Sequence, residues 1–282
     1  MIVTRFAPSP TGYLHLGHAF SALSAFEAAR GGRFLVRIED LDPGRTRDAF
    51  VAAIFDDLRW LGLRWEEPVL RQSTRSEVYR AALDRLDEQG LLYPCFCTRA
   101  DVSAEIARAA EAPHGPDGAL YPGTCRRLSS ARRKELQNAG TPYALRLDSR
   151  KAAARLPQLT FAEAALETNS PDNQIAVHPL LFGDVVLARK DVPASYHLAV
   201  VIDDAEQGVT LVTRGRDLLP AAHIQRVLQE LLALPAPRYA HHRLILDESG
   251  QKLSKREGAT SLRVLRAHGV SPDRIRSKFV QG

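Results

Sequence analysis

The chain has 282 residues with 45% hydrophobic and 25% charged side chains, a globular composition with room for one large domain or two. No apolar run approaches the roughly 20 residues of a membrane span, no signal peptide is recognisable, and three cysteines argue against a secreted disulfide framework, so a reducing cytoplasm is expected. The net charge of +5 and the pI of about 9.3 are compatible with a polyanionic partner but equally with solubility alone.

The first 40 residues predict a strand–helix–strand unit. Residues 3–8 are typical of a short strand that two prolines end, because proline cannot continue a β-ladder. Apolar residues then recur with a helical period from Leu16 until a pair of glycines, and residues 34–38 form a second strand. A βαβ unit of this length implies a parallel sheet with a right-handed crossover.

More elements of the same kind follow. An apolar stripe from Phe50 to Leu61 predicts a second helix, and a capping box of Thr74 and Glu77 predicts a third that ends at Gly90. From residue 175 the α/β pattern returns, with strands expected at 185–189 and 209–214 and helices near 199–204 and 224–231.

Residues 95–174 differ from both flanks, and we interpret them as an insertion. They hold all three cysteines, a stretch rich in glycine and proline, and a basic cluster that is either a phosphate-contacting surface or a solvated helix face, formed by Arg126, Arg127, Arg132, Arg133 and Lys134. The expected domains are the first half of a nucleotide-binding catalytic domain (1–94), the insertion with a zinc site (95–174), the second catalytic half (175–238), and a polar loop with a short C-terminal helical region (239–282).

The segment APSPTGYLHLGH at residues 7–18 joins the first strand to the first helix. In an open α/β sheet this position lies at the carboxyl end of a strand, where ligands bind, and a helix N-terminus attracts phosphate. His15 and His18 share one face of the first turn, and Gly17 lets a flat ring such as adenine approach the backbone. These features favour a nucleotide site over two surface histidines or a metal site.

A second phosphate-binding candidate is the sequence KLSKR at residues 252–256. Lys252 and Lys255 are suited to clamp a polyphosphate, and a glycine on either side suggests a mobile loop. Most runs of this kind are solvated surface, but together with residues 7–18 this one becomes a specific signal. The sequence contains neither a P-loop nor a GxGxxG motif.

APSPTGYLHLGH and KLSKR resemble the two signature motifs, HIGH and KMSKS, of class I aminoacyl-tRNA synthetases. The blocks RIEDLDPGR, YHLAVVIDD and TRGRDLL resemble the glutamyl-tRNA synthetase branch, and the match runs over most of residues 1–260. The chain stops soon after KLSKR, a plan similar to the shortened paralogues of that branch, the glutamyl-Q tRNA(Asp) synthetases, so no anticodon-binding domain is expected. One departure is Arg216, where full-length enzymes usually carry an acidic residue.

The resemblance implies an ATP-dependent ligase with an α/β fold. Its Rossmann-like parallel sheet would carry an inserted zinc-binding, acceptor-type subdomain. Such an enzyme activates L-glutamate, with Mg²⁺ carried by ATP, and attaches it to queuosine in the anticodon loop of tRNA(Asp); no membrane or DNA partner is expected. The attacking carboxylate is already an anion, so catalysis needs positioning and stabilisation of phosphate charge rather than a protein base. Catalysis is expected from His15, His18, Lys252 and Lys255, and ATP binding from His15, Gly17, His18 and Lys255.

The glutamate substrate needs an anion for its ammonium group and cations for its two carboxylates. Glu39 suits the ammonium group, and arginines suit carboxylates because they pair with them bidentately; how Arg5 and Arg214 divide the two is left open. The positions that match the family's glutamate pocket are Arg5, Ala7, Ser9, Glu39, Tyr196 and Arg214. Asp40 and Asp42 are expected to be turn and cap residues.

Cys95, Cys97 and Cys125 predict a structural zinc site, which would hold an insertion with little apolar periodicity. Three thiolates need a fourth ligand. Chemistry alone favours His114, because tyrosine is a rare zinc ligand, whereas the resemblance favours Tyr121. The alternative is three thiols without a metal.

Three other functions share some of these motifs. A minimal glutamyl-tRNA synthetase would charge the 3′ end of tRNA(Glu), a small-molecule nucleotidyltransferase would use the HxGH motif, and a silent tRNA-binding protein would keep only the fold. The glutamate blocks count against the second, and the intact histidines and lysines count against the third.

Overall fold

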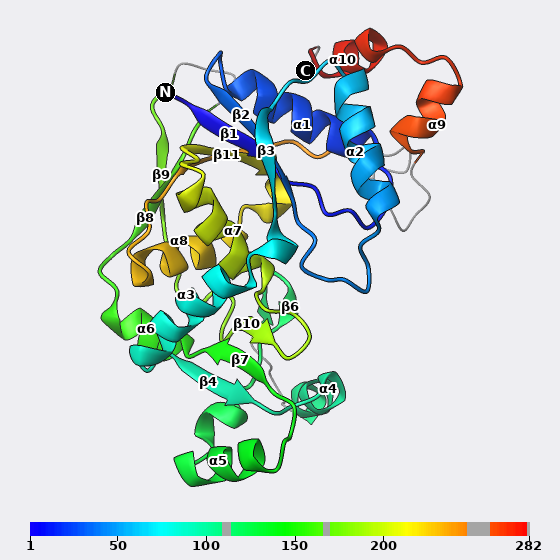
Figure 1. Cartoon of the computed structure of the whole chain (residues 1–282). Coiled ribbons are helices and arrows are strands. Elements are labelled where there is room, and N and C mark those ends of the chain that lie inside the picture. The colour runs from blue at the N-terminus through cyan, green and yellow to red at the C-terminus, as the bar shows by residue number, and fades with distance from the viewer. Residues whose placement is uncertain (109–113, 166–169, 247–259, 281–282) are drawn as a thin grey trace.

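The structure is a computed structural model and describes residues 1–108, 114–165, 170–246 and 260–280 (Figure 1). The helices are α1 (Leu16–Ala28), α2 (Asp48–Trp60), α3 (Ser76–Glu88), α4 (Arg99–Arg108), α5 (Ser130–Asn138), α6 (Ser149–Arg155), α7 (Tyr196–Glu206), α8 (Ala221–Leu231), α9 (Leu262–Ala267) and α10 (Pro272–Val280), with the 3₁₀ turns η1 (Gln72–Thr74), η2 (Cys125–Arg127) and η3 (Arg216–Leu218). The strands are β1 (Val3–Phe6), β2 (Arg33–Ile38), β3 (Glu66–Arg71), β4 (Leu92–Cys95), β5 (His114–Gly115), β6 (Gly118–Ala119), β7 (Ala144–Leu147), β8 (Thr160–Glu163), β9 (Asn173–Ala176), β10 (Val186–Arg189), β11 (Leu211–Gly215) and β12 (Arg238–His242). Among these described residues no helix is both long and apolar enough to cross a membrane.

The predicted βαβ unit is present and forms the centre of a larger parallel arrangement. β1 pairs in parallel with β2, and β2 pairs in parallel with β3. On its other side β1 adjoins β11, and the Thr210 N–H just before β11 donates to the Val3 carbonyl at 3.0 Å. β11, β12 and β8 continue in parallel, and β9 pairs antiparallel with β8. The loops that follow the parallel strands therefore meet at one edge.

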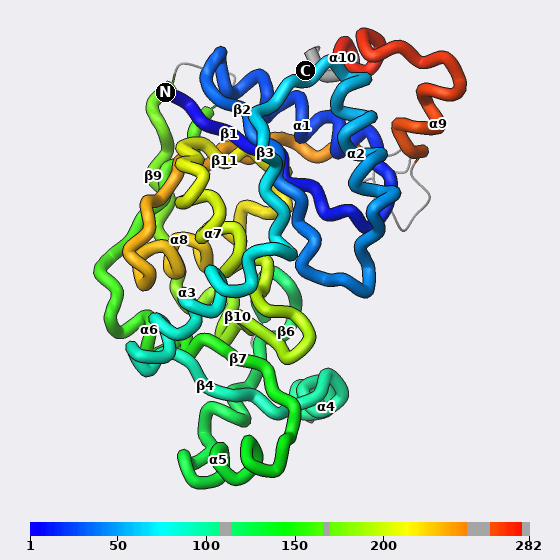
Figure 2. Tube along the Cα trace, in the orientation of Figure 1, coloured from blue at the N-terminus to red at the C-terminus, as the bar shows by residue number. Residues whose placement is uncertain are grey.

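The side chains of β2 alternate between two cores. Phe34, Val36 and Ile38 pack with α1 and α2, whereas Leu35 packs with Ala222 of α8. Successive residues of a strand point to opposite faces, and burial on both faces explains the nearly continuous apolar sequence of β2. Figure 2 shows the blue α1 and α2 in the upper part of the molecule and the yellow-to-orange α7 and α8 below β1 and β11.

The lower part of the molecule in Figure 1 is built around an antiparallel sheet in the order β10-β7-β4. This pairing differs from the division expected at residue 174. β10 lies in the same sheet as β4 and β7, although its sequence is predicted to belong to the second catalytic half. β8, which falls within 95–174, pairs with β12 and with β9, which runs across the expected boundary. Composition shows where the cysteines lie. It does not report which strands pair, and strand pairing determines which strands share a sheet. The domain boundaries stay predictions.

The expected C-terminal helical region packs against the first half of the chain. Leu262 of α9 and Ile275 of α10 are buried in the core that also contains residues of α1 and α2. The Arg276 side chain donates to the Leu61 carbonyl. The end of the chain is therefore tied to the helices that follow β1 and β2.

The capping box predicted for α3 is wrong. The Thr74 hydroxyl donates to the Arg71 carbonyl at 2.8 Å within η1, and Arg75 occupies the cap position without a side-chain hydrogen bond. The helix still begins near the predicted residue, because its buried stripe of apolar residues, Tyr79, Ala82, Leu83 and Leu86, stabilises it by packing.

The two acidic residues expected in turns behave differently. Asp42 forms a turn, and its Oδ1 accepts from the Gly44 N–H at 3.1 Å. Asp40 is instead a buried contact between distant segments, because its carboxylate accepts from Arg71 Nε at 2.9 Å and from the Ser73 N–H at 2.8 Å. The turn interpretation of Asp40 is therefore wrong.

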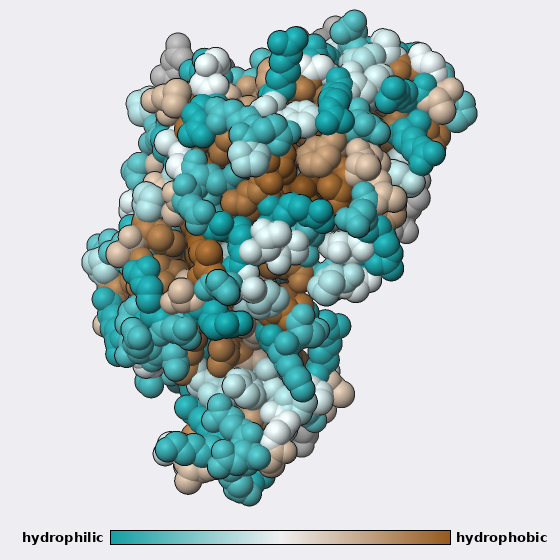
Figure 3. Space-filling model, in the orientation of Figure 1, coloured by the Kyte–Doolittle hydropathy of each residue, from teal (hydrophilic) through white to brown (hydrophobic). Residues whose placement is uncertain are grey.

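The basic cluster at 126–134 is divided in the structure. Arg126 donates to Asp184 at 2.6 Å and Arg133 donates to the Arg126 carbonyl at 2.8 Å, so these two arginines stabilise the subdomain itself. Arg127 and Arg132 are mostly exposed and face acidic partners. α5, which follows, has no buried residue, and the lower end of the molecule in Figure 3 is largely hydrophilic. The solvated-face interpretation fits this segment better.

Candidate active site

A cavity of about 670 Å³ opens at the carboxyl ends of β1, β2, β11 and β12. Its walls come from the loops after these strands, as expected for ligand sites in open parallel sheets. It is lined by every described residue that the sequence predicts for catalysis, glutamate binding or ATP binding, namely Arg5, Ala7, Ser9, His15, Gly17, His18, Glu39, Tyr196 and Arg214. Lys252 and Lys255 lie outside the described residues.

His15 and His18 lie side by side at the N-terminus of α1, with ring centroids 3.8 Å apart. His15 Nδ1 accepts from the Gly17 N–H at 3.1 Å, and His18 Nδ1 accepts from the His15 N–H at 3.2 Å. A neutral imidazole that accepts at Nδ1 carries its proton on Nε2, so each ring offers an N–H donor there. Two such donors beside the positive end of a helix dipole are suited to phosphate oxygens.

Gly17 leaves room for the ring of His15, two residues before it. A Cβ atom on residue 17 would lie 3.0 Å from Cε1 and 3.1 Å from Nδ1 of the His15 ring. Because real Cβ contacts are rarely this short, a larger residue would require the His15 ring to shift by a few tenths of an ångström. Gly17 also lines the cavity, as the sequence predicts for a residue over which a flat ring can pass.

The chain on both sides of the lysine-bearing segment lies at the same cavity. Leu244 and Ile245 line it before residues 247–259, and Ser261 forms a β-bridge with His15 after them. The Leu262 N–H also donates to the Leu14 carbonyl at 2.7 Å. The described residues before the segment that bears KLSKR line the cavity, and those after it are hydrogen-bonded to the segment that bears HLGH.

Arg5 lines the cavity from β1 and is held from behind. Its Nε donates to Asp204 Oδ1 at 3.1 Å, and its Nη1 donates to the Thr213 carbonyl at 3.3 Å. Arg37 pairs with the same carboxylate, and all three charged groups are buried. Burial alone raises the pKa of Asp204, but attraction to Arg5 and Arg37 outweighs burial and keeps that pKa below its ordinary value. Asp204 is therefore an anion near neutral pH, and its hydrogen bond holds the Arg5 guanidinium.

Arg214, near the end of β11, is held by two other side chains. Its Nε donates to His241 Nε2 at 3.0 Å, and its Nη1 donates to Gln225 Oε1 at 2.8 Å. Its Nη2 is buried and has no hydrogen-bond partner among the described residues. A buried guanidinium nitrogen without a partner at a cavity favours an anionic ligand such as a carboxylate.

Glu39 follows β2 and lines the cavity near Arg5. Burial raises the pKa of Glu39 to about 7, against the lowering effects of Arg37 and Arg5. A carboxyl group that ionises near neutrality gains from a cationic ligand, because a nearby ammonium group would favour its charged form.

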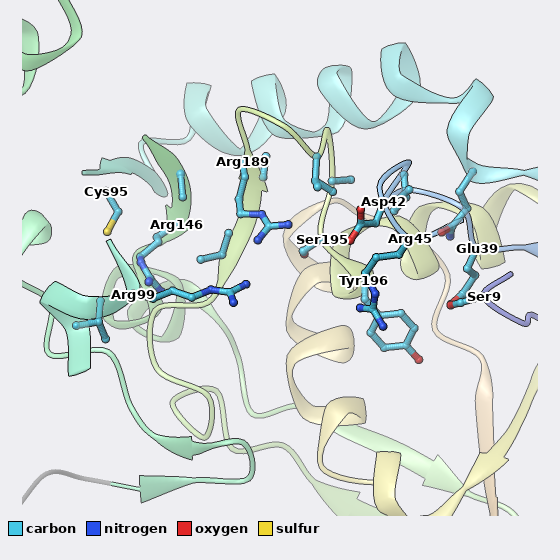
Figure 4. Close-up of a pocket in the computed structure, with 18 of the residues that line it drawn as sticks. Ser9, Glu39, Asp42, Arg45, Cys95, Arg99, Arg146, Arg189, Ser195 and Tyr196 are labelled. Atoms are coloured by element: carbon cyan, nitrogen blue, oxygen red, sulfur yellow. The ribbon is translucent and has the colours of Figure 1, made fainter. Parts of the chain in front are cut away.

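A second cavity, of about 830 Å³, extends from the first toward the cysteines. Ser9, Thr11, Glu39 and Tyr196 line both cavities. Figure 4 shows Arg99 and Arg189 reaching into the space between Cys95 and Tyr196. Four arginines line this second cavity, Arg45, Arg99, Arg146 and Arg189. Glu39 and Asp42 are the acidic residues of this lining, so the cleft has an excess of positive charge, which suits a polyanion.

The three cysteines converge beside this cleft, with their sulfur atoms within 4.8 Å of one another. The Tyr121 hydroxyl lies 3.4 Å from Cys95 Sγ and 3.5 Å from Cys97 Sγ, and Cys97 Sγ lies 3.4 Å from Cys125 Sγ. Ligand atoms of a tetrahedral zinc site lie about 3.5–3.8 Å apart, so these four groups fit zinc with little adjustment. His114 is exposed on β5 and is not part of this cluster.

Sequence reasoning missed the residues that hold the two arginines. Asp204 stands in the block YHLAVVIDD, where an acidic pair at the end of an apolar helix is a signal of buried charge. His241 carried no such signal, because nothing in the sequence shows which residue of β12 lies opposite Arg214. Arg216, the unusual residue of TRGRDLL, is exposed on η3 and does not line either cavity.

Comparison with known proteins finds relatives over nearly the whole chain. Residues 1–280 match the family described as tRNA synthetases class I (E and Q), catalytic domain. A protein of Rhodobacter capsulatus named glutamyl-Q tRNA(Asp) synthetase is 48% identical over 98% of this chain and 98% of its own length. The glutamate–tRNA ligase of Aquifex aeolicus is 38% identical over 97% of this chain, which spans 55% of that ligase.

Solved structures agree in fold. The crystal structure of a glutamate tRNA ligase from Elizabethkingia meningosepticum in complex with its amino acid is similar with a TM-score of 0.73 and 29% identity, over 91% of this chain and 52% of that chain. Methionyl-tRNA synthetase of Mycobacterium tuberculosis bound by methionyl-adenylate has a TM-score of 0.56 at 13% identity, over 99% of this chain and 64% of that chain, which is a likeness of fold alone.

Proposed function

The chain belongs to the class I tRNA synthetases of the E and Q type, and from this premise we propose that it activates L-glutamate with ATP and transfers the glutamyl group to queuosine in the anticodon loop of tRNA(Asp). The observation that carries this proposal is the 48% identity to a glutamyl-Q tRNA(Asp) synthetase along 98% of both chains. The place of action would be the cytoplasm, where tRNA is modified.

In the activation step, an oxygen of the glutamate α-carboxylate attacks the α-phosphorus of ATP, and the bond to the bridging oxygen breaks as pyrophosphate leaves with its Mg²⁺. The Nε2–H groups of His15 and His18 are the donors that we assign to the phosphates, beside the N-terminus of α1. Lys252 and Lys255 are assigned to the departing pyrophosphate, a role supported by the chain on both sides of their segment, which lies at the cavity. Loss of one such donor raises the barrier by about 2.7–4 kcal/mol.

The glutamate pocket is assigned to residues that line the first cavity. Arg5 and Arg214 bind the two carboxylates, and Glu39 binds the ammonium group. Asp204 supports Arg5, and the partnerless Nη2 of Arg214 supports a carboxylate beside it. The hydroxyl groups of Tyr196 and Ser9, with the backbone near Ala7, complete the pocket.

The second cavity is the path that we assign to the tRNA. It begins at Ser9, Glu39 and Tyr196, where the activated carbonyl would lie, and four arginines line it. Arg45 and Arg99 are exposed, as groups that meet the phosphate backbone of a partner must be. In the transfer step a queuosine hydroxyl attacks the carbonyl carbon of the mixed anhydride, and AMP leaves as the anhydride bond breaks.

Zinc is assigned to Cys95, Cys97, Cys125 and Tyr121, whose spacing fits tetrahedral coordination. The bound ion would supply folding energy by joining the end of β4 to the segment around η2, and it has no open position for chemistry. Tyr121 is favoured over His114 because its hydroxyl already lies among the sulfur atoms, where it accepts from the Cys125 N–H at 2.9 Å.

The test is an acceptor assay with labelled glutamate, ATP and Mg²⁺. The acceptors are queuosine-containing tRNA(Asp), unmodified tRNA(Asp) and tRNA(Glu). The proposal expects label on modified tRNA(Asp) alone. This tRNA should still accept label after periodate has oxidised its 3′ end, provided that queuosine is protected from the periodate. Label on tRNA(Glu) that requires an intact 3′ end would instead identify a minimal glutamyl-tRNA synthetase.

A further inference from the structure

A chain of hydrogen bonds from the half-buried Glu163 reaches the buried Arg214 from the side of β8 and β12. Glu163 Oε2 lies 2.8 Å from His241 Nδ1, and Glu163 Oε1 accepts from the His241 backbone N–H at 2.8 Å. Arg214 Nε then donates to His241 Nε2 at 3.0 Å. The side chain of His241 is only 1% exposed, so the order of protons along this chain is set by the protein rather than by water.

The chemistry of the three groups allows one arrangement of protons. A guanidinium group can only donate, so His241 Nε2 must be an acceptor. The proton of the neutral ring is then on Nδ1, and it is donated to Glu163. A proton on Nε2 would face the Nε–H of Arg214 and would repel it. Glu163 therefore selects the histidine tautomer that Arg214 needs.

Neighbouring charges support this arrangement. Burial lowers the pKa of His241 more than Glu163 and Asp217 raise it, and Arg214 adds to the lowering, so the ring stays neutral. Burial raises the pKa of Glu163, but the hydrogen bonds from His241 outweigh burial, so its carboxylate stays charged. The ring of Tyr239, on the same strand, lies parallel to the His241 ring, with centroids 6.0 Å apart and an angle of 5° between the rings.

We propose that Glu163 and His241 are positioning residues for the amino-acid substrate: through one histidine tautomer they aim the Arg214 guanidinium at a substrate carboxylate. This rests on the proposed function, because it takes glutamate as the ligand of Arg214. Gln225 holds Nη1 and His241 holds Nε, which leaves the buried Nη2 without a partner among the described residues. Aiming matters because a bidentate carboxylate pair depends on the direction of the guanidinium plane.

The test measures ATP–pyrophosphate exchange at pH 7.5, with KM for glutamate, KM for ATP and kcat determined separately. His241→Leu removes the acceptor, and Glu163→Gln can donate to Nδ1 and so favours the wrong tautomer. Each is expected to raise KM for glutamate about tenfold, the loss typical of one hydrogen bond to a charged group, with KM for ATP unchanged. His241→Gln restores a neutral oxygen acceptor near the Nε2 position and should return KM for glutamate to within about threefold of wild type.

Two comparisons distinguish aiming from a merely structural role. In the His241→Leu background, Glu163→Gln should have no further effect on KM for glutamate, because the two residues act through the same contact. Glu230→Gln, which breaks an ion pair with Arg226 on the outer face of α8, is the matched control and should not change KM for glutamate.

The outcomes separate this inference from the proposed function. If wild-type protein exchanges pyrophosphate with glutamate but Glu163→Gln and His241→Leu keep its KM for glutamate, the positioning role is refuted and the function stands. Additive effects in the double variant, or KM for ATP rising as much as KM for glutamate, would also refute it. If wild-type protein shows no glutamate-dependent exchange with or without tRNA, the proposed function itself fails. If His241→Leu does not fold, comparing KM for glutamate between Glu163→Gln and His241→Gln tests the positioning role instead.

Discussion

Asp204 accepts a hydrogen bond from Arg5 Nε at 3.1 Å, and this contact joins the first strand of the chain to α7 behind the candidate glutamate pocket. Arg37 pairs with the same carboxylate, and both arginines lie far from Asp204 in the sequence. The direction of Arg5 is therefore set by a buried anion that does not line the cavity. Arg214 is held in a similar way by His241 and Gln225.

Replacing Asp204 by asparagine should destabilise the protein. The change leaves Arg5 and Arg37 buried without their anion, and breaking a buried pair on one side costs about 3–5 kcal/mol. Urea unfolding at pH 7.5 measures the loss. Asp56→Asn is the control, because Asp56 pairs with Arg59 on an exposed face, and it should cost less than about 1 kcal/mol. Equal losses for both variants would contradict the assigned role.

Asp204 also predicts a direction for the acid response. Its pKa is held below the ordinary value, so the folded state binds fewer protons at this group than the unfolded state. Its contribution is present above pH about 4, the unfolded value, and is lost as pH falls through the folded value. Between wild type and Asp204→Asn, the difference in unfolding free energy should therefore shrink on acidification.

Glu39 should make glutamate binding depend on pH near neutrality. Its pKa is raised to about 7 by burial, so below that pH the carboxyl group is neutral and attracts an ammonium group weakly. KM for glutamate should rise as pH falls from 8 to 6. Binding near pH 7 should also release a proton, because the ammonium group favours the carboxylate.

Calorimetry in buffers of different ionisation enthalpy measures the number of protons released when glutamate binds. Glu39→Gln should bind glutamate more weakly at pH 8 and should lose both the proton release and the pH dependence. For stability the sign is opposite to that of Asp204, because a raised carboxyl pKa makes the folded state less stable as pH rises from about 4 to about 7. Glu39→Gln should therefore be more stable than wild type at pH 8, and a less stable variant would argue against a raised pKa at this position.

Tyr121 and His114 give opposite predictions for the metal. Tyr121→Phe should lower zinc affinity, because it removes the hydroxyl that lies between Cys95 and Cys97, whereas His114→Ala should retain about one zinc per chain. Elemental analysis after dialysis against a weak chelator measures both variants. Stripping the metal from wild type should lower the melting temperature of the protein. Loss of zinc from His114→Ala with retention in Tyr121→Phe would reverse the ligand assignment.

The arginines of the second cavity should govern tRNA affinity and its salt dependence. Arg99→Ala and Arg189→Ala should each weaken binding of tRNA(Asp) about threefold to tenfold and reduce the slope of log K against log salt by about 1. Filter binding between 50 and 200 mM salt, values at which such slopes are resolved, measures both quantities. Arg80→Ala, an exposed arginine on α3 outside the cavities, is the control. An equal effect of Arg80→Ala would indicate that tRNA affinity depends on the positive charge of the protein in general rather than on this cleft.

Local sequence predicted the parts of this protein that depend on neighbours along the chain. The βαβ unit, the placement of His15 and His18 on one turn, and the position of Glu39 at a strand end follow from periodicity and from residues a few positions apart. The turn role expected for Asp40 and the capping box at Thr74 were exceptions. A short motif there competed with a hydrogen bond to Arg71, and packing of the helix determined where it begins.

Tertiary structure alone decided which distant residues support the site. Whether Tyr121 or His114 lies among the cysteines depends on the fold of the loop around η2, and β10 joins the sheet of β4 through pairing with β7. The partners of the two arginines follow from the register of β11 on β12 and from the packing of α7 against β1. Such contacts join residues far apart in sequence, and the free energy that selects them comes from burial and pairing of the whole chain. A sequence motif therefore predicts which residues bind the substrate, whereas the distant residues that support them are determined only by the folded chain.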